Sequence, residues 1–139
     1  MSDKDHPKPV VGIIIYNDTG EVLLGKSSKW TDKWVVFWGH VEWGESLVEA
    51  VKRETKEETG LEIENVEFLS LQESIFSEEF HKPKHMIFLN YTAKALNNKV
   101  VLNDEMQEYV WIKPEKALLE LNLNKSSKIF LEKFSQNIK

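Results

Sequence analysis

The segment from Gly39 to Leu61 constrains this chain more than any other. It reads GHVEWGESLVEAVKRETKEETGL and gathers many glutamates around a single arginine, Arg53, with a glycine near each end. Carboxylates crowded on one short helix repel each other unless a cation lies among them. The leading interpretation is therefore a divalent-metal site, and such a metal points to phosphate chemistry.

Capping signals mark both ends of a helix within this segment. Ser46 is a candidate N-cap, and Glu49, three residues later, completes a capping box. Gly60 stands where a left-handed C-cap residue belongs. We therefore predict a helix over residues 47–59. Its buried side would consist of Leu47, Val48, Val51 and Thr55.

The rest of the chain alternates predicted strands with a few helices. Residues 1–8 read as a loose leader, and residues 27–33 and 77–84 as polar loops. Pro114 at a first helical position opens a helix to about Leu121, and Ser126 or Ser127 could cap a last helix ending near Gln136. Strands are predicted over residues 9–16, 21–25, 34–38, 66–76, 85–95 and 109–112. This order predicts one α/β domain with a mixed sheet between helices.

Composition excludes several classes of protein. The chain has 139 residues, a formal net charge of -5 and no cysteine. Such a length suits one domain, and the acidic balance disfavours binding to a nucleic-acid backbone. Disulfides and thiolate metal sites are excluded. The polar N-terminus has no apolar signal core and no apolar run reaches membrane-spanning length, so we expect a cytoplasmic protein without nucleic-acid or membrane partners.

Three carboxylates share one face of the predicted helix. At about 100° per residue, Glu54, Glu57 and Glu58 fall within an arc of roughly 100°. They lie in the last turn, where the helix dipole disfavours anions. Oxygen ligands on one face suit Mg²⁺, with Mn²⁺ as a possible substitute. The alternative is a solvated acidic face paired with the basic side chains of the same helix.

The same residues resemble a known family. The chain matches the Nudix box, G-x5-E-x7-R-E-U-x-E-E-x-G-U, in which U is aliphatic. The matching positions are Gly39, Glu45, Arg53, Glu54, Glu57, Glu58, Gly60 and Leu61. Strand order and length also resemble the whole Nudix domain, so the resemblance implies a Nudix-type, MutT-like α/β/α sandwich. It also implies hydrolysis of a nucleoside diphosphate linked to another moiety.

The resemblance implies a role for each charged position. Glu57 and Glu58 would be metal ligands, and Glu54 a further ligand or the base that activates water. The backbone carbonyl of Gly39 would join the metal sphere. Glu105, six residues before Trp111, resembles an additional ligand in relatives.

The resemblance also implies a supporting pair beside these ligands. Glu45 and Arg53 resemble the pair that braces the loop against the helix. Glu105 could also be a carboxylate of a surface turn, and Glu108 is then the fallback ligand.

Two positions depart from the family pattern. Thr55 stands where an aliphatic residue is usual. Phe37-Trp38 precedes Gly39 where relatives carry Pro-Gly. No carboxylate is lost, but the geometry of the Gly39 loop, the activity or the substrate choice could differ.

Four tryptophans lie within residues 30–43, which suggests either a stacking wall for a nucleobase or core filling. We expect Trp34 and Trp111 in the core. Trp38 and Trp43 could line the rim of the site or be exposed, and Trp30 would lie in an exposed loop. Phe80 and His81 are candidate base contacts at a loop tip, although a histidine there is more often structural, as for His85.

Two functions from different classes remain open. The first is Mg²⁺-dependent hydrolysis of a small nucleotide, preferably a nucleoside triphosphate to monophosphate and pyrophosphate, with ADP-ribose or a nucleotide sugar as the alternative substrate. The second is a catalytically impaired nucleotide-binding module. RNA binding is disfavoured by the net charge. A homodimer is possible, but nothing in the sequence identifies an interface.

Overall fold

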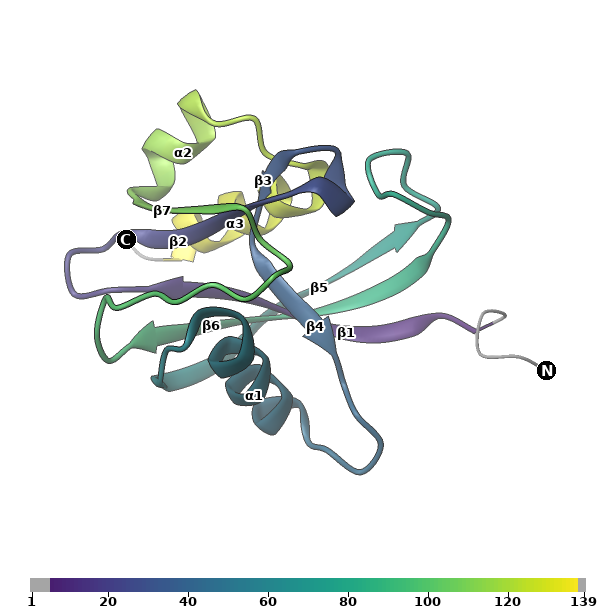
Figure 1. Cartoon of the computed structure of the whole chain (residues 1–139), viewed down its shortest axis with the longest axis horizontal. Helices are drawn as coiled ribbons and strands as arrows, with labels where there is room; N and C mark the ends of the chain where they lie inside the picture. Colours follow the sequence, from purple (N-terminus) through teal and green to yellow (C-terminus); the bar gives the residue numbers. More distant parts are fainter. Residues whose placement is uncertain (1–5, 138–139) are drawn as a thin grey trace.

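Aliphatic and β-branched runs form a seven-stranded mixed sheet (Figure 1). The computed structural model describes residues 6–137. The strands are β1 (Lys8–Tyr16), β2 (Val22–Ser27), β3 (Lys33–Val35), β4 (Phe37–His40), β5 (Ile63–Ile75), β6 (His85–Ala95) and β7 (Glu108–Ile112). The helices are η2 (Ser28–Trp30, one 3₁₀ turn), α1 (Leu47–Thr59), α2 (Pro114–Glu120) and α3 (Lys125–Asn137).

The central strand β1 has three neighbours. It runs parallel to β6 along its whole length, from Lys8 opposite Met86 to Tyr16 opposite Lys94. Its first half pairs antiparallel with β4, and its end leads through a turn into β2. The order along the sheet is β3-β2-β1-β6-β5, and β7 pairs with β2. β4 also packs against α1, since Gly39 lies against the side chain of Glu54, and the chain leads from β4 into that helix.

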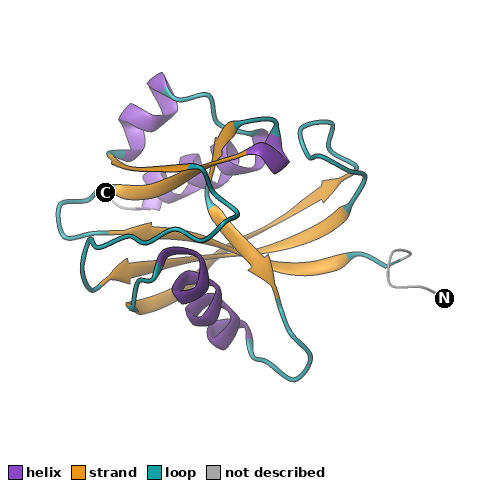
Figure 2. Cartoon of the chain, in the orientation of Figure 1, coloured by secondary structure: helices purple, strands orange, loops and turns teal. Residues whose placement is uncertain are grey.

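Helices cover both faces of the sheet (Figure 2). On one face, Ala50 and Val51 of α1 pack into a cluster with Val11, Ile13 and other side chains of the sheet. On the other face, Ala117 of α2 and Phe130 of α3 pack around Ile14 and its neighbours. The predicted α/β/α sandwich with a mixed sheet is confirmed.

Helix α1 begins and ends at the predicted residues. The Ser46 side chain accepts a hydrogen bond from the Glu49 backbone, and the Glu49 side chain accepts one from the Ser46 backbone. Gly60 adopts a left-handed conformation with φ of 74°. The predicted buried side is correct for Val51 and Thr55 and wrong for Val48, which is exposed, whereas Leu47 is half-buried against the core. The helix instead turns Ala50, Glu58 and Thr59 inward.

The predicted single strand over 34–38 is divided into β3 and β4 at Val36. The reason is a change of partner: β3 pairs with β2 and β4 pairs with β1. The Val36 amide between them donates to the Ser127 hydroxyl at 2.9 Å. Neither Ser126 nor Ser127 caps α3, because the helix already begins at Lys125. That role belongs to Asn124, whose side chain accepts from the Ser127 amide.

The first strand begins one residue earlier than predicted. Lys8, placed in the leader, belongs to β1, and residues 1–5 of that leader lie outside the described part of the chain. The loop predicted over 27–33 contains the end of β2 and the short helix η2. Among residues 6–137, no helix combines the length and the apolar character needed to cross a membrane.

Candidate active site

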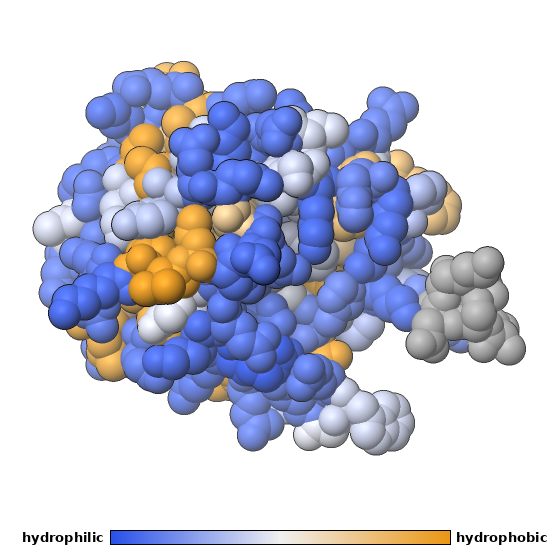
Figure 3. Space-filling model, in the orientation of Figure 1, coloured by the Kyte–Doolittle hydropathy of each residue, from blue (hydrophilic) through white to orange (hydrophobic). Residues whose placement is uncertain are grey.

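A cleft of about 570 Å³ lies over one side of α1 and collects most of the predicted site residues. Its walls come from β4, α1 and four loops, which are those around η2, between β4 and α1, between β5 and β6, and before β7. The surface over α1 is almost uniformly hydrophilic (Figure 3). The cleft contains both acidic and basic side chains. The acidic ones are Glu42, Glu54, Glu57, Glu58 and Glu105, and the basic ones include Lys29, Arg53, Lys82 and Lys84.

Arg53 holds the glutamate-rich segment together. Its guanidinium forms a two-pronged interaction with Glu45, with N–O distances of 2.6 and 2.9 Å. It also donates to Glu54 at 2.8 Å, to Glu57 at 3.2 Å and to the backbone carbonyl of His40 at 2.9 Å. The hydrogen bond from Arg53, followed by the one from the Glu42 backbone amide, lowers the pKa of Glu45. Glu45 and Arg53 thus join the loop after β4 to α1, as expected of a pair that holds this loop against the helix.

Gly39 is buried in β4, directly against the side chain of Glu54. A Cβ atom added at Gly39 would overlap three atoms of that side chain, including its carboxylate. Only glycine leaves space for Glu54 at this point. Despite Phe37-Trp38 before it, the Gly39 position therefore keeps a close approach between backbone and carboxylate.

Glu58 is the most buried carboxyl group of the cleft, with only 2% of the residue exposed. Burial, followed by the neighbouring Glu54, raises the pKa of Glu58 to about 10. Its Oε2 atom is buried and has no hydrogen-bond partner. An unpartnered carboxyl oxygen beside a second carboxylate is a poor arrangement for stability alone. A divalent cation would satisfy this oxygen, so the donor set fits Mg²⁺ or Mn²⁺.

In this structure, the carboxylates of the cleft do not point toward a common centre. Among residues 6–137, no three histidine, aspartate or glutamate side chains are gathered closely enough to enclose a metal ion. The physical reason is Arg53, which draws Glu54 and Glu57 toward its guanidinium. Shared binding of a cation by these side chains would require them to turn from Arg53.

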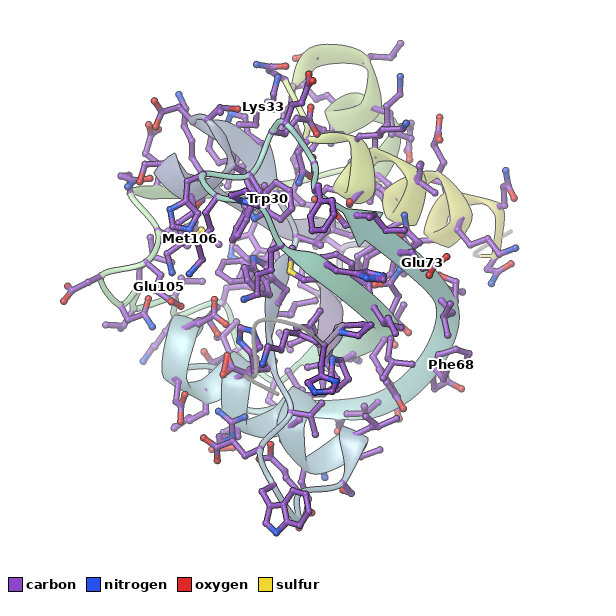
Figure 4. The ribbon with its side chains drawn as sticks, turned by 90° about the vertical axis from the view of Figure 1, so that its right-hand side faces the viewer. Trp30, Lys33, Phe68, Glu73, Glu105 and Met106 are labelled. Atoms are coloured by element: carbon purple, nitrogen blue, oxygen red, sulfur yellow. The ribbon has the colours of Figure 1, made fainter. Side chains whose placement is uncertain are left out.

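Glu105 reaches the cleft on the loop before β7. That loop is attached to the end of α1, because Val101 donates to the Thr59 carbonyl and Asn103 to the Glu58 carbonyl. Figure 4 labels Glu105 and Met106 on this loop. Glu105 forms an ion pair of 3.0 Å with Lys29. Glu108, the fallback ligand, lies in β7 and does not line the cleft.

The tryptophans are distributed differently from the expectation. Trp30, expected in an exposed loop, is 1% exposed and lies in the core under the cleft, because the 3₁₀ turn η2 directs it inward. Trp34 and Trp111 are only half-buried, although each packs against a core cluster. Trp43 is fully exposed and does not line the cleft.

The other three predicted substrate contacts do line the cleft: Trp38, Phe80 and His81. Phe80 is only 6% exposed and lies among aromatic rings, with Trp30 at 4.5 Å and Trp38 at 5.9 Å between centroids. Little of its ring face is free for a nucleobase. His81 is exposed beside Phe80, and burial and nearby lysines lower its pKa.

Sequence reasoning identified Arg53 but missed the lysines of the cleft. Lys84, just before β6, places its Nζ 2.7 Å from Nε2 of His40. Burial first, and then Lys82, Lys8 and Lys29, lower the pKa of Lys84. The run His81-Lys82-Pro83-Lys84-His85 in an acidic chain was the available signal. The sequence predicts an exposed loop up to Lys84 and a strand from His85, and the contact with His40 across 44 residues cannot be predicted from it.

Comparisons with known proteins agree with this geometry. The profile of the NUDIX domain matches residues 6–134. The nucleoside triphosphatase NudI of Salmonella agona is 32% identical over 127 residues, which cover 84% of this chain and 89% of that protein. The crystal structure of a MutT Nudix hydrolase from Burkholderia pseudomallei has a TM-score of 0.78 at 26% identity, covering 92% of this chain and 98% of the other.

A second solved structure, the MutT protein of Methanosarcina mazei, has a TM-score of 0.77 at 28% identity and covers both chains completely. The family profile spans nearly all the described residues, including every position of the glutamate-rich segment. This chain therefore belongs to the Nudix family and is a Nudix hydrolase.

Proposed function

We propose that the protein is a Mg²⁺-dependent pyrophosphohydrolase that cleaves a nucleoside triphosphate to the monophosphate and pyrophosphate. One observation carries the metal dependence: the buried carboxyl group of Glu58, with an unpartnered Oε2, lies beside Glu54 in a cleft lined by further carboxylates. The preference for a triphosphate is supported by the nucleoside triphosphatase named among the relatives. Lysines in the same cleft suit a polyanion.

At least four groups would hold the cation. Glu57 and Glu58 would be ligands from the last turns of α1, and Glu105 would approach from the loop before β7. The Gly39 carbonyl would contribute from β4, where the side chain of Glu54 packs closely against it. Glu54 is either a further ligand or the base that takes a proton from the attacking water. When bound, the cation neutralises the diphosphate oxygens and makes water a stronger nucleophile.

Arg53 and Glu45 have a positioning role in this proposal. Arg53 fixes the His40 carbonyl and Glu45 on one side, and Glu54 and Glu57 on the other. The carboxylates therefore stay close together, although their charges repel each other. Arg53 also compensates those charges until substrate and cation arrive, so the helix remains folded.

A substrate panel tests the proposal. Purified protein is incubated with excess Mg²⁺ and each of the common nucleoside triphosphates, ADP-ribose and a nucleotide sugar, and product phosphates are separated and quantified. We expect monophosphate and pyrophosphate from at least one triphosphate, and no turnover after chelation of Mg²⁺. Cleavage of ADP-ribose or nucleotide sugars alone would replace the substrate assignment. Binding without cleavage, in Mg²⁺ or Mn²⁺, would identify a nucleotide-binding module.

A further inference from the structure

Lys84 is held in a fixed position on the wall of the cleft. Its Nζ is 2.7 Å from Nε2 of His40 and lies over two aromatic rings, 5.5 Å from the centroid of Trp38 and 5.9 Å from that of Phe80. His40 is itself fixed, because Arg53 donates to its backbone carbonyl at 2.9 Å. The flexible lysine side chain is therefore already ordered, which reduces the entropy that it would lose on binding a ligand.

The charge of Lys84 is not balanced by a carboxylate. Two other cations of the cleft have acidic partners: Lys29 pairs with Glu105, and Arg53 with Glu45 and its neighbours. Within the described residues, Lys84 forms no ion pair with an aspartate or glutamate. It is half-buried, and nearby lysine charges act on it unfavourably. An anion beside its ammonium group would offset both the burial of this charge and the repulsion from the other lysines.

The substrate class of the cleft supplies such an anion. The carboxylates of α1 and their cation would bind the part of a nucleoside triphosphate that contains the cleaved bond. The phosphates beyond that bond then carry further negative charge, which needs a cationic group. Lys84 lies in the same cleft, on the loop between β5 and β6 rather than on α1.

We propose that Lys84, held by His40, Trp38 and Phe80, binds the terminal phosphates of the substrate, which leave as pyrophosphate. This inference rests on the proposed function and adds a determinant of specificity to it. It gives Trp38 and Phe80 a different role from nucleobase stacking, because their rings support the ammonium group. Such a subsite would favour triphosphates over diphosphates joined to an uncharged moiety.

Binding of inorganic pyrophosphate in the presence of Mg²⁺ tests the subsite without turnover. Titration calorimetry would compare the wild type with Lys84→Gln, Lys84→Arg and the exposed control Lys128→Gln on α3. We expect Lys84→Gln to weaken pyrophosphate binding by about 10-fold to 100-fold, the effect of losing a charged hydrogen bond. Lys84→Arg should keep most of the affinity, and Lys128→Gln all of it.

Other results would overturn the inference. These are equal affinity in Lys84→Gln and the wild type, no binding of pyrophosphate to the wild type, or weakened binding of adenosine monophosphate with pyrophosphate binding unchanged. Kinetics give a second measurement: Lys84→Gln should raise KM for the triphosphate far more than it lowers kcat. If the wild type hydrolyses no nucleotide but binds pyrophosphate through Lys84, the proposed function fails and the subsite stands.

Discussion

The Glu54 side chain occupies the space where a Cβ atom of Gly39 would lie. This contact joins β4, where the glutamate-rich segment begins, to the helix that carries its carboxylates. Gly39→Ala should therefore push Glu54 out of position while leaving the remaining ligands in place. We expect kcat/KM to fall by about 10-fold or more, equivalent to at least 1.4 kcal/mol of transition-state stabilisation, with the protein still folded.

Gly44→Ala is the matched control for that variant. Gly44 has a φ of 81° and open space around its missing side chain. Alanine there strains the backbone by about 1 kcal/mol without touching Glu54. Thermal melts and steady-state kinetics should show lower stability with nearly full activity for Gly44→Ala. Equal activity losses in the two variants would show that backbone strain, and not the displaced carboxylate, is responsible.

Glu45→Gln should lower stability in a pH-dependent way. The pKa of Glu45 in the fold lies below its ordinary value of 4.5 because Arg53 stabilises the carboxylate. Its stabilising contribution is therefore complete above the ordinary pKa and is lost as the pH falls through the depressed one. Melting curves should show a lower Tm for Glu45→Gln at pH 7, and the difference should shrink below about pH 4.5.

Glu132→Gln, an exposed change on α3, controls for the loss of one negative charge. It should show no comparable difference in Tm at any pH. A Tm difference for Glu45→Gln that stays constant down to pH 3 would contradict the role of the Glu45–Arg53 pair.

Glu58→Gln should separate stability from metal binding. Burial raises the pKa of Glu58, so at neutral pH the fold pays for a carboxyl group that ionises more readily when unfolded. Glutamine removes this cost but also removes the ligand. Without divalent cations, we expect the variant to be at least as stable as the wild type. Mg²⁺ should raise the Tm of the wild type and raise that of Glu58→Gln much less. Equal Mg²⁺ shifts would show that Glu58 is not a ligand.

Local signals predicted the glutamate-rich helix accurately. The capping box at Ser46 and the left-handed Gly60 define its ends through contacts within a few residues, so no knowledge of the rest of the fold was needed. The spacing of Glu54, Glu57 and Glu58 likewise placed all three on the cleft. Strands rich in aliphatic residues were found for the same reason.

Features that depend on distant partners were missed. The break at Val36 arises because its amide bonds to Ser127, 91 residues later. Trp30 is buried because η2 and the loop before β6 close over it, and His40 meets Lys84 only after β4 and β6 are assembled on β1. Trp43 lies within the motif and was a candidate site residue, but it is fully exposed and does not line the cleft. An aromatic residue within a motif therefore need not contact the site.

The central claim is that the carboxylates of α1 perform metal-dependent hydrolysis, and Glu57→Gln tests it most directly. Glu57 lies at the exposed edge of the cleft, so glutamine should leave the fold intact. Pyrophosphate release from a nucleoside triphosphate would be measured at saturating Mg²⁺ for the wild type, Glu57→Gln and Glu132→Gln. We predict a loss of about 100-fold or more for Glu57→Gln alone, with an unchanged circular dichroism spectrum. Wild-type activity in Glu57→Gln would contradict the account.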